Sequence, residues 1–237
     1  MTSHRIRFAA MGVLAITLVL PLCAAAAKQP PQTTFDGLEL RPNTKLAVVY
    51  LRPEADFSGY RKVALLDCAV AFKKDWQRNQ NSTNPLAISA KDMDDIRKAL
   101  GTMFSEVFRD VLTKGGYELT DKAGDDVLVL RPAIIDLNIS SPAAAEAGRS
   151  KTYATSAGAM TMYLEVYDSS TNEILARTVD RKQATDYGRM TWQNSATNKT
   201  EARRMMTEWA ETLRAGLDRL RATSPSPAAT PAKAAPR

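Results

Sequence analysis

The spacing of apolar residues near the middle of the chain constrains the fold more than any other feature. Apolar side chains recur at steps of three and four between residues 93 and 112, which is typical of an amphipathic helix. Ser89 and Asp92 match a capping box at its start, and a lysine followed by two glycines at residues 114–116 marks its end. Such a helix must bury its apolar face, so the chain has to supply a second layer, and we expect that layer to be a sheet.

The second strong pattern is a strict alternation of apolar and polar residues over residues 160–167. It predicts a half-buried antiparallel strand. The turn sequence DSSTN at residues 168–172 leads to a partner strand at about residues 174–186. Residues 127–139 predict another strand, and Pro132 inside it indicates an edge position or a bulge, because proline cannot donate to a ladder.

The remaining elements are shorter. Apolar runs predict strands at residues 46–51 and 62–72, whereas the polar residues 73–85 and the small residues 140–158 predict loops. A last helix is expected from Asn198 as its cap to Leu220, with Trp209 in its apolar stripe. Too few helices separate the strands for a doubly wound parallel sheet. We therefore expect an α+β fold: a mixed, mostly antiparallel sheet of about five strands with two amphipathic helices packed on it.

The first 27 residues have the pattern of a secretory signal peptide. Arg5 and Arg7 give it a positive start, and an apolar run at residues 8–20 follows. Small residues then allow cleavage after Ala26 or Ala27. We expect the mature protein in the periplasm.

Cys23 offers an alternative, because a cysteine after such a run is where a bacterial lipoprotein is cleaved and acylated. Leu22 before it is bulky where a small residue is expected, which favours cleavage at the alanines. Contact with a membrane, as a lipid anchor in the outer membrane, is expected only if Cys23 is lipidated. Otherwise Cys68 is the single cysteine left; it lies in an apolar run and is expected to be buried and inert.

These signals divide the chain into four parts. Residues 1–27 form the signal peptide, residues 28–44 an extended lead-in and residues 45–221 a single α+β domain. Residues 222–237 consist almost wholly of Ala, Pro, Ser and Thr, so we expect a disordered tail. The formal net charge of +6 includes cations of the signal peptide and the tail, so the body is less basic and no nucleic-acid partner is expected.

The only histidine, His4, lies in the signal peptide. The mature chain therefore lacks the residues for Ser-His-Asp or Cys-His catalysis and for histidine-based zinc sites. No P-loop or calcium-loop motif is present. We assign no catalytic residue, cofactor or metal ligand, and we do not expect an enzyme.

Carboxylates keep one alternative open, a periplasmic carboxylate-based hydrolase of the glycosidase kind, which would need two acids facing one cleft. The aspartates in or beside predicted strands are Asp67, Asp136, Asp168, Asp180 and Asp186. No spacing selects a pair, and structural roles are favoured: Asp168 closing a turn, and Asp180 pairing with Arg177 or Arg181.

Two tryptophans lie in polar segments and are candidates for an exposed binding surface. They are Trp76 and Trp192, which could stack on sugars. Partial burial over the sheet is the commoner outcome for a lone tryptophan.

Several segments together resemble a family of Gram-negative envelope proteins known as domain of unknown function 3313. The resemblance rests on residues 35–38 (FDGL), 47–53 (AVVYLRP), 59–65 (GYRKVAL) with the later Trp76, 130–136 (LRPAIID) and 164–176 (LEVYDSSTNEILA). Asn172 stands where a glycine is expected, and asparagine tolerates the same backbone. The resemblance implies an envelope location, often as a predicted lipoprotein, and brings no catalytic residues. We expect a non-catalytic envelope protein that binds another protein or a cell-wall component.

Overall fold

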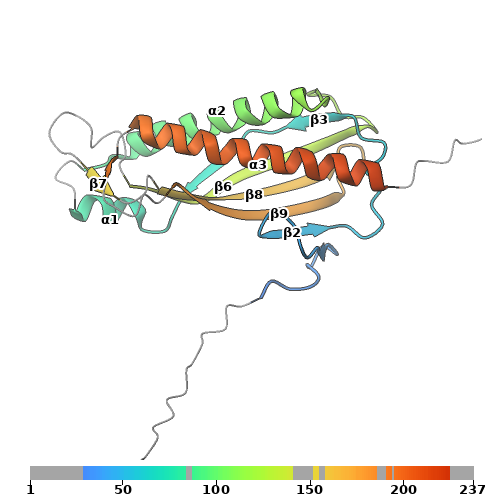
Figure 1. The fold of residues 1–237 in the computed structure, drawn as a ribbon, viewed down its shortest axis with the longest axis horizontal. Helices are drawn as coiled ribbons and strands as arrows, with labels where there is room; N and C mark the ends of the chain where they lie inside the picture. The colour runs from blue at the N-terminus through green and yellow to red at the C-terminus, as the bar shows by residue number, and fades with distance from the viewer. Residues whose placement is uncertain are drawn as a thin grey trace, which may run out of the picture.

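Three helices and a large mixed sheet make up the described part of the chain. The computed structural model describes residues 29–83, 87–140, 152–154, 158–185, 191–193 and 195–224. The helices are α1 (Trp76–Thr83), α2 (Ala90–Lys114) and α3 (Ser195–Thr223). Helices α2 and α3 lie side by side across one face of the sheet (Figure 1). None of the described helices combines the length and the apolar character that crossing a bilayer requires.

The sheet has eight strands in the order β1-β2-β9-β8-β6-β3-β5, with β4 also paired to β6. Along this order every pair from β1 to β6 is antiparallel, whereas β3, β4 and β5 join by parallel pairs. A separate small sheet pairs β7 (Thr152–Ala154) with β10 (Thr191–Gln193). The strands of the large sheet are β1 (Glu39–Leu40), β2 (Val48–Leu51), β3 (Lys62–Leu65), β4 (Ala69–Phe72), β5 (Glu118–Leu119), β6 (Val127–Ile139), β8 (Gly158–Asp168) and β9 (Ile174–Gln183).

The α+β class is confirmed, and the strands outnumber the five expected. The additional strands are short, with two residues in β1 and in β5 and three in β7 and in β10. Segments of that length show no periodicity, because two or three residues cannot display an alternation. β7 lies within the segment that was predicted to be a loop.

Helix α2 forms as its spacing predicts. The Ser89 hydroxyl accepts from the backbone of Asp92, and the Asp92 carboxylate accepts from the backbone of Ser89 in return. Its buried side chains include Phe104 and Phe108, whose stacked rings lie 3.9 Å apart between centroids. Trp209 of α3 is also fully buried, so the core lies between the two long helices and the sheet.

The predicted strand 62–72 is two strands, β3 and β4, and both pair with β6. Pro132 was predicted to lie at an edge or a bulge; β6 is an inner strand, but its neighbour on one side is interrupted at Pro132, which makes a local edge there. Leu65 is paired with Leu130 and Ala69 with Ala133, so Pro132 lies where the neighbouring chain leaves the sheet. A proline without an N–H is tolerated there because no strand pairs with it on the side of β3 and β4, although Leu164 of β8 pairs with it on the other side.

Two other boundaries differ from expectation. Residues 73–85 were predicted to be a loop but contain α1. The polar side chains of this helix bind the backbone of the segment that follows it: the Asn81 amide donates to the backbone oxygen of Ile88 and accepts from its N–H. Helix α3 begins at Ser195 instead of Asn198 and continues to Thr223, two residues into the predicted tail. The predicted signal peptide with Cys23 and Ala27, and residues 225–237 of the tail, lie outside the described residues.

Candidate functional site

Trp76, a candidate for an exposed binding surface, is instead buried over the sheet, which was the commoner outcome expected for a lone tryptophan. Its exposed fraction is 3%, and its ring stacks on Phe72 of β4 at 4.4 Å between centroids. The indole Nε1 donates to the backbone oxygen of Ile139 at 3.3 Å. Helix α1 folds this tryptophan back over the sheet, which the polar sequence around it concealed. Trp192 lies in β10 opposite Tyr153, and its side chain is outside the described part of the structure.

The candidate aspartates lie at separate places in the fold. Asp168 closes the β8–β9 turn, as predicted, by accepting from the backbone of Ser170 and Thr171 at 2.8 and 2.7 Å. Asp180 pairs with neither Arg177 nor Arg181, as had been expected; it accepts instead from the Trp209 indole and the Ala47 backbone N–H. Asp67 and Asp136 are exposed, and Asp186 lies outside the described residues.

Cys68 is half-buried and free. Burial raises the pKa of its thiol to about 12, so the thiol stays protonated near neutral pH and is a poor nucleophile. Within the described ranges, no three His, Cys, Asp or Glu side chains come together as metal ligands would.

An ion cluster lies on the sheet face opposite α2 and α3, with the buried Glu165 at its centre and the exposed Arg131 at its rim. The Glu165 carboxylate, 3% exposed, accepts from the hydroxyls of Tyr163 and Tyr167 at 2.6 and 2.8 Å and pairs with Arg131 and Arg177. Arg177 also pairs with Asp36 of the lead-in, so two carboxylates face two guanidinium groups. With its charges balanced, this cluster fastens the lead-in to the sheet. The alternation of apolar and polar residues along β8 predicts that the two tyrosines and Glu165 share one face of the sheet. Which arginines face them depends on the register between strands, and the sequence does not show that register.

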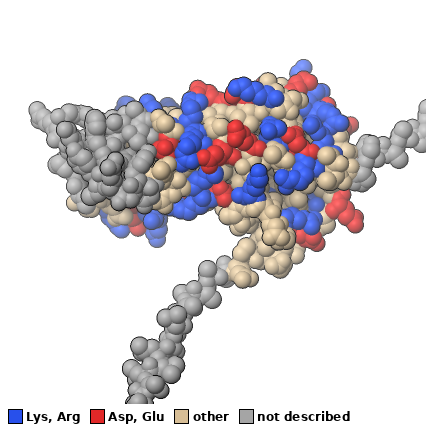
Figure 2. Space-filling model, in the orientation of Figure 1, with Lys and Arg blue, Asp and Glu red and all other residues tan. Residues whose placement is uncertain are grey.

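The outer face of α3 carries both signs of charge. Figure 2 shows Lys and Arg interspersed with Asp and Glu over this side of the molecule. Several are paired along the helix, as Arg204 with Glu208 and Arg214 with Asp218.

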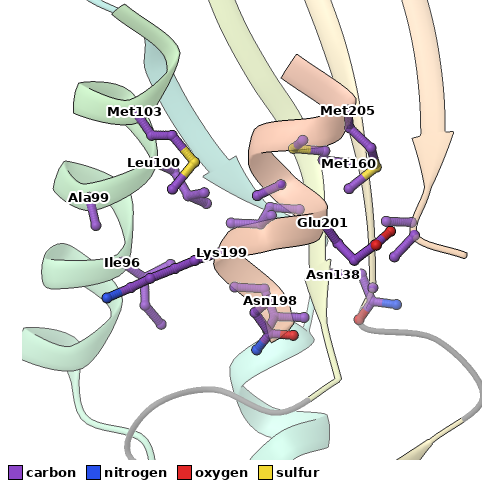
Figure 3. A pocket seen from close by; sticks show the side chains of 16 residues that line it. Ile96, Ala99, Leu100, Met103, Asn138, Met160, Asn198, Lys199, Glu201 and Met205 are labelled. Carbon is purple, nitrogen blue, oxygen red and sulfur yellow. The ribbon is translucent and has the colours of Figure 1, made fainter. Parts of the chain in front are cut away.

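The best candidate for a binding site is an apolar cavity of about 110 Å³ at one end of the helix pair, which we call the helix-end pocket (Figure 3). Three methionines contribute to it from three elements: Met103 from α2, Met160 from β8 and Met205 from α3. The other lining residues are mainly aliphatic: Ile96, Ala99, Leu100, Leu137, Asn138, Ile139, Gly158, Ala159, Ala184, Asn198, Lys199, Glu201 and Ala202. Sequence reasoning missed this pocket, because its walls meet only in the tertiary structure.

The charged residues of the helix-end pocket do not make it a catalytic centre. Burial opposes the charge of Glu201, but the Thr185 backbone N–H and the Arg204 guanidinium outweigh it and hold its pKa below the usual value. Glu201 is therefore ionised, and its carboxylate is held by hydrogen bonds to the Thr185 backbone and to Arg204. Lys199 is exposed. What the pocket offers chemically is an apolar, polarisable wall that can adapt its shape.

Comparison with known families supplies the identity. Residues 35–213 match the model of the family described as "Protein of unknown function (DUF3313)". The chain belongs to the DUF3313 family. A search among curated proteins gave no match for this DUF3313 protein.

Comparison with solved structures finds matches at low identity and low TM-score. They include the PelC dodecamer from Paraburkholderia phytofirmans, with 12% identity, 69% of this chain and 96% of that chain covered, and a TM-score of 0.37. A minor lipoprotein from Acinetobacter baumannii gives 12% identity, coverage of 68% and 95%, and a TM-score of 0.34. Protein XCC0632 from Xanthomonas campestris gives 11% identity, coverage of 73% and 90%, and a TM-score of 0.37. At these TM-scores the likenesses carry no functional argument.

Proposed function

We propose that this DUF3313 protein is an exported, non-catalytic protein of the cell envelope that binds another protein through the helix-end pocket. The observation that carries the proposal is the methionine-lined, apolar wall of that pocket. An apolar side chain of a partner protein would fill it without leaving polar groups unpaired.

The pocket favours a protein over a cell-wall glycan as the ligand. A sugar brings hydroxyl groups, and burying them without partners costs free energy. Trp76 and Trp209, which could otherwise stack on a sugar ring, are both buried in the core. An apolar cavity of about 150 Å³ can hold a benzene ring, so a smaller pocket of about 110 Å³ suits one branched aliphatic side chain.

Export is supported by the charge and hydropathy pattern of residues 1–27. The intact mass of the protein recovered from the cell envelope tests it. A mass beginning at Ala27 or Lys28 would support a periplasmic protein, and an acylated mass beginning at Cys23 would support a lipid-anchored one. An unprocessed chain recovered with the cytoplasm would overturn the proposal.

The binding site is tested by photo-crosslinking in the envelope with a matched pair of variants. Ala99 and Lys98 are neighbouring exposed residues of α2, and only Ala99 lines the pocket. We expect Ala99→Phe to fill the pocket and abolish crosslinks formed from a probe at Asn138. Lys98→Phe should leave them unchanged. Equal crosslinking by both variants, or no crosslinked protein with the unaltered pocket, would refute the site.

A further inference from the structure

A second pocket lies on the same side of the sheet, near the other end of α3, and has a different chemistry. It has a volume of about 140 Å³ and lies between α3 and the strands β2, β8 and β9. Its floor is apolar, and it shares no lining residue with the helix-end pocket. The floor residues include Val49, Leu51, Val166, Ala176, Leu213 and Leu217. We call it the basic-rimmed pocket.

The charged residues that line the basic-rimmed pocket are all cations: Arg41, Lys45 and Arg219. All three are exposed. Neither Lys45 nor Arg219 forms an ion pair with any described residue, and Arg41 is 3.8 Å from Glu39, with both side chains close to half exposed. Such a surface pair contributes little, so the three cations are available to an incoming anion.

One buried polar group of this pocket is unsatisfied. Thr178 of β9 is 5% exposed and lines the pocket, and its hydroxyl has no hydrogen-bond partner among the described residues. A buried hydroxyl without a partner costs free energy. Because Oγ1 itself is fully buried, we infer that the methyl group is the part of Thr178 that faces the pocket. A rotation about χ1 would exchange the two groups and bring the hydroxyl to the pocket.

Gly216 shows that the space in this pocket is open. It lies inside α3 and lines the pocket, and a Cβ added there would meet nothing within 4 Å. Glycine inside a helix costs about 1 kcal/mol relative to alanine. The helix therefore carries a destabilising residue at the point where a side chain would project into empty space.

From these observations we propose that the basic-rimmed pocket binds a single-chain anionic amphiphile. Its carboxylate or phosphate lies among Arg41, Lys45 and Arg219, and its alkyl chain enters the apolar floor. An oxygen next to the chain accepts from the Thr178 hydroxyl. The volume accommodates the first few methylene groups, so the rest of a longer chain remains outside. This site is independent of the proposed protein partner, since it uses other residues.

Binding of decanoate and of decyl phosphate below their micelle concentrations tests the proposal on the mature protein. Methyl-detected NMR should show shifts at Val49, Leu213 and Leu217, and none at Met103 and Met205 of the helix-end pocket. A response to one probe identifies the headgroup, carboxylate or phosphate, and a response to both identifies a site for anions in general. Neutral decanol should bind at least about tenfold more weakly, and added salt should weaken the anions.

Substitutions test the contributions of the cationic rim and of the apolar space to binding separately. Lys45→Gln with Arg219→Gln should weaken decanoate binding about tenfold, as expected for losing two charge contacts. Lys122→Gln, an exposed lysine outside the pocket, should change nothing. Gly216→Leu should abolish binding while the protein stays folded, because the leucine fills the open space. Thr178→Val should weaken binding, and Thr178→Ser should restore it.

Three results would overturn the proposal. These are equal binding of decanol and decanoate, an unchanged affinity in Gly216→Leu, or an absence of methyl shifts with both anions. The last would mean that no anionic amphiphile of this kind enters the pocket. Because the assay uses the isolated protein, its failure leaves the crosslinking result at the helix-end pocket unaffected, and the two proposals fail separately.

Discussion

The indole N–H of Trp209 donates a 2.7 Å hydrogen bond to Oδ2 of Asp180. This bond joins the buried face of α3 to β9, and the other oxygen of the same carboxylate accepts from the Ala47 backbone N–H at 2.8 Å. One aspartate thus holds together the last helix, the sheet and the chain entering β2.

Replacing this carboxylate should destabilise the fold. Asp180→Ala leaves the fully buried indole N–H without its acceptor, and we expect a loss of about 2 kcal/mol in the free energy of unfolding. Urea denaturation followed by circular dichroism measures it. Asp67→Ala, at an exposed aspartate, is the control and should stay within about 0.5 kcal/mol of the parent. Similar effects of the two substitutions would contradict this role.

The Glu165 cluster predicts a dependence of stability on pH. Burial opposes the charge of Glu165, but the hydroxyls of Tyr163 and Tyr167 and the guanidinium groups of Arg131 and Arg177 outweigh it and lower its pKa to about 2 from 4.5. A carboxyl with a lower pKa in the folded state stabilises the protein above its unfolded pKa. That contribution should be lost as pH falls from about 4.5 to about 2.

Glu165→Gln tests the same cluster. At pH 7 the variant should be less stable by about 3 kcal/mol, and the difference should shrink as the pH approaches 2. Thermal unfolding of both proteins between pH 7 and pH 2 measures it. A stability difference that does not change over this range would show that the carboxylate charge contributes nothing.

Cys68 should react slowly in the folded protein. With the pKa of its thiol raised to about 12 by burial, the thiolate fraction at pH 8 is small, so alkylation by iodoacetamide should be at least about tenfold slower than in urea. Mass spectrometry of the mature chain gives the rate, and Cys68→Ala gives the background. Equal rates in the folded and unfolded protein would contradict the burial of this thiol.

The capping box of α2 should contribute measurably to stability. Ser89→Ala removes the side-chain acceptor for the Asp92 backbone N–H, and we expect a cost of about 1 kcal/mol. Thr102→Ala, at an exposed position inside the same helix, is the matched control and should be neutral or slightly stabilising. Chemical denaturation of both variants measures the change in the free energy of unfolding. An equal cost for Ser89→Ala and Thr102→Ala would contradict the role of the capping box.

Features that depend on neighbouring residues were predictable. The apolar spacing of α2 and the alternation of β8 match the structure because each pattern reports one element's own geometry. The β8–β9 turn also forms as its residues indicate. Asn172 has a φ of 58°, which is the left-handed backbone that asparagine tolerates in place of glycine.

Features that depend on distant partners were not predictable. Helix α1 and the burial of Trp76 rest on contacts with Phe72 and Ile139, and the break between β3 and β4 rests on their pairing with β6. Polar composition suggested an exposed loop, since local propensity carries no information about such partners.

By itself, the sequence determined the α+β class, the two long helices, the turn chemistry and the absence of histidine after residue 4. Tertiary structure alone decided which charges meet at Glu165 and where α2 and α3 leave apolar space against the sheet. The physical reason is that periodicity records how a segment presents its own side chains. Pockets and ion clusters instead arise from the register between strands and from the way helices pack on them, which bring together residues far apart in the chain.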